Sequence, residues 1–113
     1  MTPPRGAIQH VVLLNFAREL TPDEHAELAR QIRAWPHGIG GFLELRFGRD
    51  LTGARTRGYQ YLLFEVFPDE AALKAYASHP LHRAFADWVH ERGCEEIAFD
   101  YIIDDETVVV DAT

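Results

Sequence analysis

Apolar residues recur at every second position in four separate stretches of the chain, which is the pattern of β-strands. One face of the first stretch carries Val12, Leu14 and Phe16, and the other face carries Val11 and Leu13. A small antiparallel sheet normally buries only one face under its own helices, so a strand that is apolar on both faces predicts a second cover, most simply another copy of the chain. The predicted strands cover residues 8–16, 39–48, 59–67 and 97–103.

Helical signals lie between these strands. Thr21-Pro22-Asp23-Glu24 combines a threonine N-cap, a proline at the first helical position and a glutamate that closes a capping box. Apolar residues at helical spacing continue from there to Trp35. Two more helices are predicted after the third strand, one over residues 70–77 and one from Pro80 to Gly93.

The order of these elements predicts an α+β ferredoxin-like sandwich with a four-stranded antiparallel sheet. Residues 1–113 are expected to form this single domain, with a short C-terminal extension over residues 105–113. The β-prone residues 107–110 of the extension are expected to dock on a sheet edge or on a partner. Two such sheets placed face to face across a twofold axis enclose a lumen and bury the second face of every strand. A homodimeric α/β barrel is therefore predicted.

Charge and composition exclude several classes of function. A net charge of −7 argues against nucleic acid as a main partner, because that binding depends on basic side chains. No apolar run approaches the roughly 18 residues of a membrane span, and no signal-peptide core precedes the first strand, so we expect a cytoplasmic protein without membrane contact. The single cysteine, Cys94, lacks the second thiol of a disulfide or CxxC motif. The arginines of loop 49–58 fit a solvated loop or a contact to an anionic ligand.

Proton-handling side chains gather in residues 73–82. Tyr76, His79 and His82 are spaced three apart, which would place them on one face of a continuous helix. Pro80 interrupts that helix, because proline removes an N–H group and pushes the preceding residue out of the α region. The two histidines are therefore expected at a bend between two helices.

Five sequence features together are similar to those of one protein family. They are the strand 8–16, the glycine-containing link before the second strand, Gly58-Tyr59, Tyr76 with His79-Pro80-Leu81-His82, and Phe99-Asp100-Tyr101. With these features the chain resembles the stress-responsive dimeric α/β-barrel (Dabb) family over nearly its whole length. The resemblance implies a ferredoxin-like protomer and a homodimer whose sheets close a barrel. The family includes stress-induced proteins, uncharacterised bacterial members and a plant polyketide cyclase that performs an intramolecular aldol condensation without a cofactor.

The resemblance to that cyclase implies roles for four residues. His82 is implied as the base, Tyr76 as its helper and Asp100 as the residue that orients the base. His10 matches a further position of the site. In the third strand the cyclase has a pocket histidine where this chain has Tyr61. This departure affects the expected identity of the substrate more than the assignment of His82 as the base.

These residue types suit aldol cyclisation of a poly-β-ketone. His82 titrates near neutrality and can accept an α-proton, while Tyr76 stays protonated and can donate to the developing oxygen. We expect Asp100 to hold the other ring nitrogen of His82, and His10 to add a donor that faces the lumen. The lumen is expected to take a small hydrophobic or carbonyl-rich molecule, without cofactor or metal, against Val12, Leu14, Phe16, Tyr61, Leu63 and Phe85.

Other interpretations of the same residues stay open. The HPxH segment also fits a helix-breaking turn in which His79 caps backbone carbonyls and His82 donates to Asp100 as a strut. A metal site is less favoured, because the helix break spoils the ligand geometry and no third ligand is local in sequence. Two function classes remain: a cofactor-independent, polyketide cyclase-like enzyme, and a non-catalytic stress-responsive dimer or small-ligand binder. An enclosed pocket that reaches Tyr76 and His82 would favour the enzyme.

Overall fold

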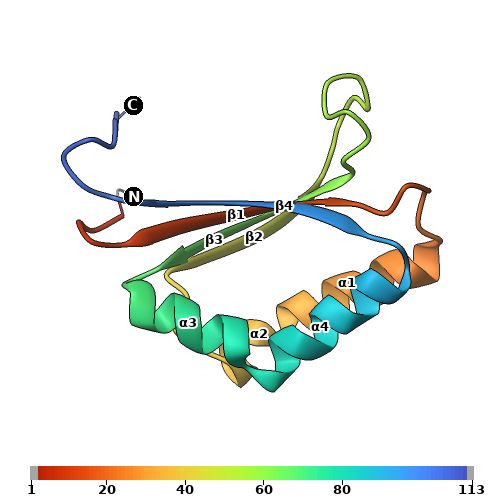
Figure 1. Cartoon of the computed structure of the whole chain (residues 1–113), viewed down its shortest axis with the longest axis horizontal. Helices are drawn as coiled ribbons and strands as arrows, with labels where there is room; N and C mark the ends of the chain where they lie inside the picture. Colours follow the sequence, from red (N-terminus) through yellow and green to blue (C-terminus); the bar gives the residue numbers. More distant parts are fainter. Residues whose placement is uncertain (1–2, 112–113) are drawn as a thin grey trace.

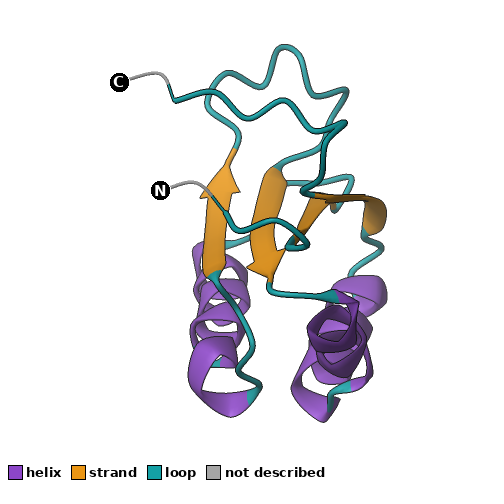
Figure 2. Cartoon of the chain, turned by 90° about the vertical axis from the view of Figure 1, so that its left-hand side faces the viewer, coloured by secondary structure: helices purple, strands orange, loops and turns teal. Residues whose placement is uncertain are grey.

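Two layers make up the chain, a four-stranded antiparallel sheet and a set of helices that cover one of its faces (Figure 1, Figure 2). The positions come from a computed structural model, which describes residues 3–111. The predicted ferredoxin-like α+β order is confirmed. In chain order the elements are β1 (Ile8–Asn15), α1 (Pro22–Arg33), α2 (Trp35–Gly38), β2 (Glu44–Arg49), β3 (Tyr61–Phe67), α3 (Glu70–Ser78), α4 (Pro80–Glu91) and β4 (Glu95–Ile102).

Strand β1 lies inside the sheet, whose strand order is β2-β3-β1-β4. It pairs antiparallel with β3 on one side and with β4 on the other. The register places His10 opposite Glu65 of β3 and also opposite Asp100 of β4. Because directly opposed residues on neighbouring strands point to the same face, these three side chains form one row across the sheet.

The helix α1 begins with the predicted capping box. The Thr21 side chain accepts a hydrogen bond from the Glu24 backbone N–H at 3.1 Å, and the Glu24 carboxylate accepts one from the Thr21 N–H at 3.0 Å. The helix turns Leu28 and Ile32 toward the sheet, where both are buried. These side chains join the main hydrophobic core between the two layers.

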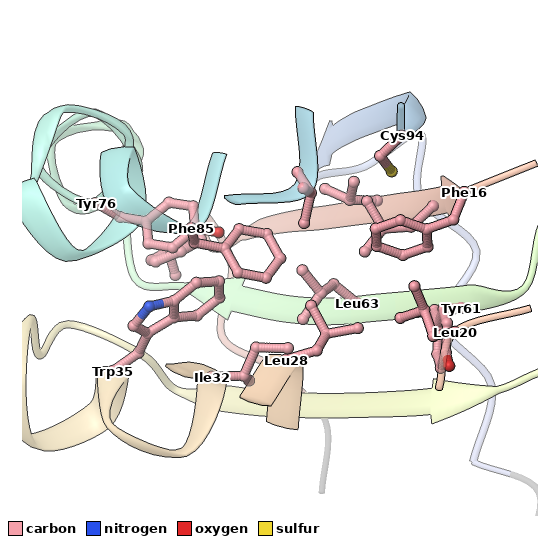
Figure 3. Close-up of a cluster of buried hydrophobic side chains, with 14 of the residues drawn as sticks. Phe16, Leu20, Leu28, Ile32, Trp35, Tyr61, Leu63, Tyr76, Phe85 and Cys94 are labelled. Atoms are coloured by element: carbon pink, nitrogen blue, oxygen red, sulfur yellow. The ribbon is translucent and has the colours of Figure 1, made fainter. Parts of the chain in front are cut away.

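Two aromatic groups lie at opposite ends of this core. Trp35, Tyr76 and Phe85 gather at one end, while Phe16 and Tyr61 lie at the other (Figure 3). Aliphatic side chains separate the two groups in the same view. The first group lies beside the bend between α3 and α4, and therefore beside the histidines that the sequence singles out.

No helix covers the second face of the sheet within residues 3–111 (Figure 1). Strand β4 presents Ile97, Phe99 and Tyr101 there, with exposed fractions of 48%, 65% and 41%. The apolar side chains of β4 thus lie on the face that no helix of the described chain covers. None of the helices in the described part of the chain is long and apolar enough to cross a membrane.

The second predicted strand and the C-terminal extension differ from the simplest form of the prediction. The second predicted strand started at residue 39, whereas β2 begins at Glu44. Ile39 instead caps α2, and Gly40 and Gly41 adopt positive φ angles of 77° and 83°, which are outside the β region. Residues 107–110 form no strand on an edge of this sheet and three of them are exposed, so their docking on a partner stays a prediction.

Candidate active site

The bend between α3 and α4 has the geometry that Pro80 predicts. Helix α3 ends at Ser78, His79 is extended (φ −68°, ψ 140°), and Pro80 is the first residue of α4. The Nδ1 atom of His79 accepts a hydrogen bond from the Leu81 backbone N–H at 3.1 Å. His79 is therefore the N-cap of α4, and the expectation that it caps carbonyl groups is wrong because its side chain turns toward the free N–H groups of the next helix.

His82 is held one helical turn into α4. Its Nδ1 atom lies 3.1 Å from the carbonyl oxygen of Ala77, in the last turn of α3. A carbonyl only accepts hydrogen bonds, so Nδ1 carries the proton and the Nε2 lone pair of neutral His82 stays available as a base. Burial lowers the pKa of His82 below its ordinary value, although the bond to Ala77 opposes this, and neutral imidazole is favoured at pH 7.

Tyr76 faces His82 across the bend, with 4.3 Å between the ring centroids. Its side chain is only 2% exposed, and the rings of Trp35 and Phe42 pack edge-on against it at 5.4 and 5.5 Å. Burial raises the pKa of Tyr76 far above the usual value, and the nearby Glu65 carboxyl raises it further. The phenol is consequently a proton donor at every ordinary pH.

A row of ionisable side chains lies on the sheet below Tyr76. The His10 Nδ1 atom is hydrogen bonded to the Asp100 carboxylate, and His10 Nε2 lies 3.5 Å from Glu65 Oε1. The His10 ring is 6.1 Å from the Tyr76 ring. Asp100 therefore pairs with His10, and the predicted pairing of Asp100 with His82 is wrong because the β1–β4 register places Asp100 directly opposite His10.

The site faces the helices. His10 belongs to the set of β1 side chains that the helices cover, and Tyr76 and His82 approach it from α3 and α4. The expectation that these residues face a lumen between two sheets is therefore wrong for this chain. The uncovered face of β1 carries the alternate residues, such as Val11 and Leu13.

Glu65 is a site residue that the sequence analysis missed. It is 0% exposed, and within residues 3–111 neither of its carboxyl oxygens has a hydrogen-bond partner. Burial raises the pKa of Glu65 to about 8, although the nearby Tyr76 lowers it in part. The sequence holds a usable signal, since Glu65 has the same strand parity as the apolar Leu63 and Phe67, and a lone carboxylate on a buried face is exceptional.

An open groove of about 280 Å3 between α3 and β4 gives access to one end of the row. Its walls include Leu73 and Lys74 of α3 and Asp100 and Ile102 of β4. The Asp100 side chain is 47% exposed, whereas that of His10 is 12% exposed. Solvent thus reaches Asp100 directly, and His10 lies between Asp100 and the buried Glu65.

The six residues predicted to shape a pocket are all buried core residues: Val12, Leu14, Phe16, Tyr61, Leu63 and Phe85. Tyr61 lies at the end of the core away from Tyr76, and its hydroxyl is 3.1 Å from His25 Nδ1 (Figure 3). That these six residues contact a substrate stays a prediction. Within residues 3–111, no three His, Cys, Asp or Glu side chains are arranged to hold a metal ion.

Comparison with known protein families identifies the fold. Residues 8–103 match the family described as Stress responsive A/B Barrel Domain. Olivetolic acid cyclase from Cannabis sativa is 24% identical over 96 residues, which cover 84% of this chain and 95% of that protein. The stress-response A/B barrel domain-containing protein HS1 from Arabidopsis thaliana is 25% identical over 87 residues, covering 76% of this chain and 80% of that protein.

A solved structure agrees with this result. It is described as a dimeric ferredoxin-like protein of unknown function from Jannaschia sp. CCS1. It is 25% identical to this chain with a TM-score of 0.71, and the match covers 85% of this chain and 98% of that chain. The predicted resemblance and the ferredoxin-like fold are therefore both confirmed.

Proposed function

The chain belongs to the stress-responsive A/B barrel domain family, and from that premise we propose that it is a cofactor-independent enzyme that transfers protons on a carbonyl-rich substrate. His82 is the base that removes a proton from the carbon next to a carbonyl group. Tyr76 is the donor to the oxygen on which negative charge develops. In its specific form the reaction is an intramolecular aldol ring closure.

The observation that carries this proposal is the hydrogen bond from His82 Nδ1 to the Ala77 carbonyl. It leaves Nε2 without a proton, and burial keeps the ring neutral near pH 7. The neighbouring Tyr76 keeps its proton. A neutral base and a protonated donor with rings 4.3 Å apart are the two groups that enolate formation needs.

The chemistry follows from these two protonation states. His82 Nε2 takes the α-proton, and the electron pair of the broken C–H bond forms an enolate whose oxygen accepts a hydrogen bond from Tyr76. The enolate carbon then attacks a second carbonyl group of the same molecule, and the new alkoxide takes a proton from the imidazolium. Similarity to a protein named olivetolic acid cyclase supports ring closure as the use of this proton transfer.

An unpartnered indole N–H supports the binding of a carbonyl group at this site. Trp35 Nε1 is buried and has no hydrogen-bond partner within residues 3–111. The Trp35 ring lies 5.4 Å from the Tyr76 ring and 6.1 Å from the His82 ring. A buried donor without a partner is costly, and a substrate oxygen would satisfy it.

A homodimer is part of the proposal. The uncovered sheet face exposes Phe99 and Tyr101, and a second copy would cover them and complete the barrel. A similar solved protein described as dimeric supports this arrangement.

A second candidate function is a non-catalytic stress-responsive dimer that binds a small ligand or none. The packing of Tyr76 favours it, because a side chain that is 2% exposed and enclosed by aromatic rings is reached only when neighbouring rings move. The similarity to a protein named as a stress-response A/B barrel protein supports the same candidate.

Hydrogen–deuterium exchange at an activated carbon separates the two candidates. The probe is 2-tetralone in D2O, followed by proton NMR with and without the protein, and a panel of soluble β-keto esters extends the test. The enzyme should accelerate exchange above the buffer rate, and His82→Gln and Tyr76→Phe should each lower the rate about 100-fold or more. His37→Gln is the control, because His37 is exposed on α2. Exchange at the buffer rate for every probe, or unchanged rates in both variants, would refute the enzyme.

A further inference from the structure

Glu65 is the one charged side chain that the described structure buries completely without a hydrogen-bond partner. Moving an ionised carboxylate out of water costs far more than a single hydrogen bond recovers, so such a group normally has a cation beside it or is neutral. Within residues 3–111 the basic side chain at ion-pair distance from Glu65 is His10. The protonation state of Glu65 therefore depends on that of His10.

The groups that face Glu65 come from three elements. On β1, His10 Nε2 lies 3.5 Å from Glu65 Oε1. On α3, Tyr76 lies above the row with its ring 6.1 Å from the His10 ring, and its proximity lowers the pKa of the Glu65 carboxyl, which burial raises. On β4, the negative charge of Asp100 acts from the far side of His10 and disfavours a second carboxylate.

The hydrogen bond between His10 and Asp100 determines which nitrogen faces Glu65. An ionised carboxylate only accepts, so His10 Nδ1 donates to Asp100 and Nε2 points its lone pair toward Glu65 when the ring is neutral. A protonated Glu65 presents an O–H group to that lone pair. His10 Nε2 and Glu65 Oε1 are about 0.5 Å farther apart than the atoms of a good hydrogen bond, so a small rotation of either side chain brings them into contact.

We propose that Glu65 is held as a neutral carboxylic acid and is the proton store of the site, linked to Tyr76 on one side and, through His10 and Asp100, to solvent in the α3–β4 groove. The raised pKa of Glu65 agrees with this geometry. Glu65 acts through Tyr76 and does not contact the substrate.

The role of this store rests on the proposed function. In a turnover that uses the store, Tyr76 and not the His82 imidazolium gives its proton to the new alkoxide, and the Glu65 carboxyl then replaces the proton on Tyr76. Glu65 recovers a proton through His10: the ring takes up a proton from solvent, its Nδ1 proton stays hydrogen bonded to the solvent-exposed Asp100, and its Nε2 proton passes to Glu65. His82 later releases the α-proton to solvent, so one proton enters, one leaves and none is consumed.

The protonation state of Glu65 is testable without any substrate. Glutamate labelled with 13C at the side-chain carboxyl is incorporated into the full chain, and the carboxyl signals are followed by NMR from pH 4 to pH 10. One signal should titrate near pH 8, and it should be absent in Glu65→Gln but present in Glu106→Gln, a control in the exposed turn after β4. If every glutamate titrates with a midpoint below about pH 5, Glu65 is ionised at neutral pH and the proposal is overturned.

The exchange reaction tests the link to Tyr76. The rate of 2-tetralone exchange in the native chain should fall above pH 8, where Glu65 loses its proton. Glu65→Gln should exchange at least about tenfold more slowly at pH 7 and should lose this alkaline fall. A Glu65→Gln profile identical to the native one would overturn the role of Glu65 while leaving His82 as the base. Exchange absent from the native chain would refute the proposed enzyme, and the carboxyl titration would still decide the state of Glu65.

Discussion

His10 and Asp100 are directly opposed residues of the antiparallel strands β1 and β4, and their side chains are hydrogen bonded on the face of the sheet beneath Tyr76. This pair connects the buried part of the candidate site with the groove between α3 and β4, because Asp100 lies in the wall of that groove. Asp100 therefore orients His10, and His82 is oriented by the α3 backbone instead.

Replacing Asp100 by asparagine should consequently affect His10 and leave His82 unchanged. The amide keeps the shape of the side chain but removes the negative acceptor of the His10 Nδ1 proton. In Asp100→Asn, the ring signals of His10 should shift in histidine-selective NMR spectra, while those of His82 stay in place. Glu95→Gln, a neutral replacement on the exposed start of β4, is the control. A shifted His82 signal with an unmoved His10 signal would contradict the observed pairing.

The helix ends and the break between α3 and α4 were predictable, because their causes are local. The Thr21 capping box needs only four consecutive residues, and Pro80 excludes a continuous helix whatever surrounds it. The side chains that share a face of the first strand were also predictable, because they follow from the alternation within residues 8–16.

Which side chains pair with one another in the site could not be predicted from the sequence alone. Whether Asp100 pairs with His10 or with His82 depends on the β1–β4 register, which is a tertiary property. Gly40 and Gly41 delay β2 because glycine adopts positive φ freely, and their sequence context fits a strand equally well. Strand parity marks Glu65 as a buried carboxylate, but its neighbours His10 and Tyr76 are seen only in the tertiary structure.

The stability of the chain should fall between about pH 6.5 and pH 8 because of Glu65. The folded chain keeps the Glu65 proton up to about pH 8, whereas the unfolded chain loses it near pH 4.5, so the folded state binds more protons in between. Stability then decreases as pH rises. His82 has the opposite effect, since its lowered pKa makes the unfolded chain bind more protons, but this effect fades above its ordinary value of 6.5.

Chemical unfolding at several pH values measures this effect. Over the window from pH 6.5 to pH 8, the native chain should lose about 2 kcal/mol of unfolding free energy. Glu65→Gln should lose little, because the amide does not titrate. If the unfolding free energies of the native chain and Glu65→Gln change with pH in parallel across this window, folding does not raise the pKa of Glu65.

His79 should contribute to stability through its N-cap bond and should have no part in proton transfer. His79→Ala removes the acceptor for the Leu81 N–H and should lower the unfolding free energy by about 1 kcal/mol. His79→Asn should recover most of the loss, because asparagine is a strong N-cap residue. Both variants should retain the native exchange rate while folded. A large loss of exchange in His79→Asn, with native stability, would assign His79 a chemical role.

The uncovered sheet face should be the dimer interface, with Phe99 near its centre of contact. Phe99 is 65% exposed in the single chain and packs edge-on with Tyr101, with 6.3 Å between the ring centroids. Burying a glutamate among such rings without a partner is costly, so Phe99→Glu should shift the assembly from dimer to monomer at micromolar concentration, as measured by light scattering. Ala26→Glu adds the same charge to the exposed side of α1 and should remain dimeric. If the native chain is monomeric under these conditions, or if both variants dissociate alike, the second copy does not cover this face.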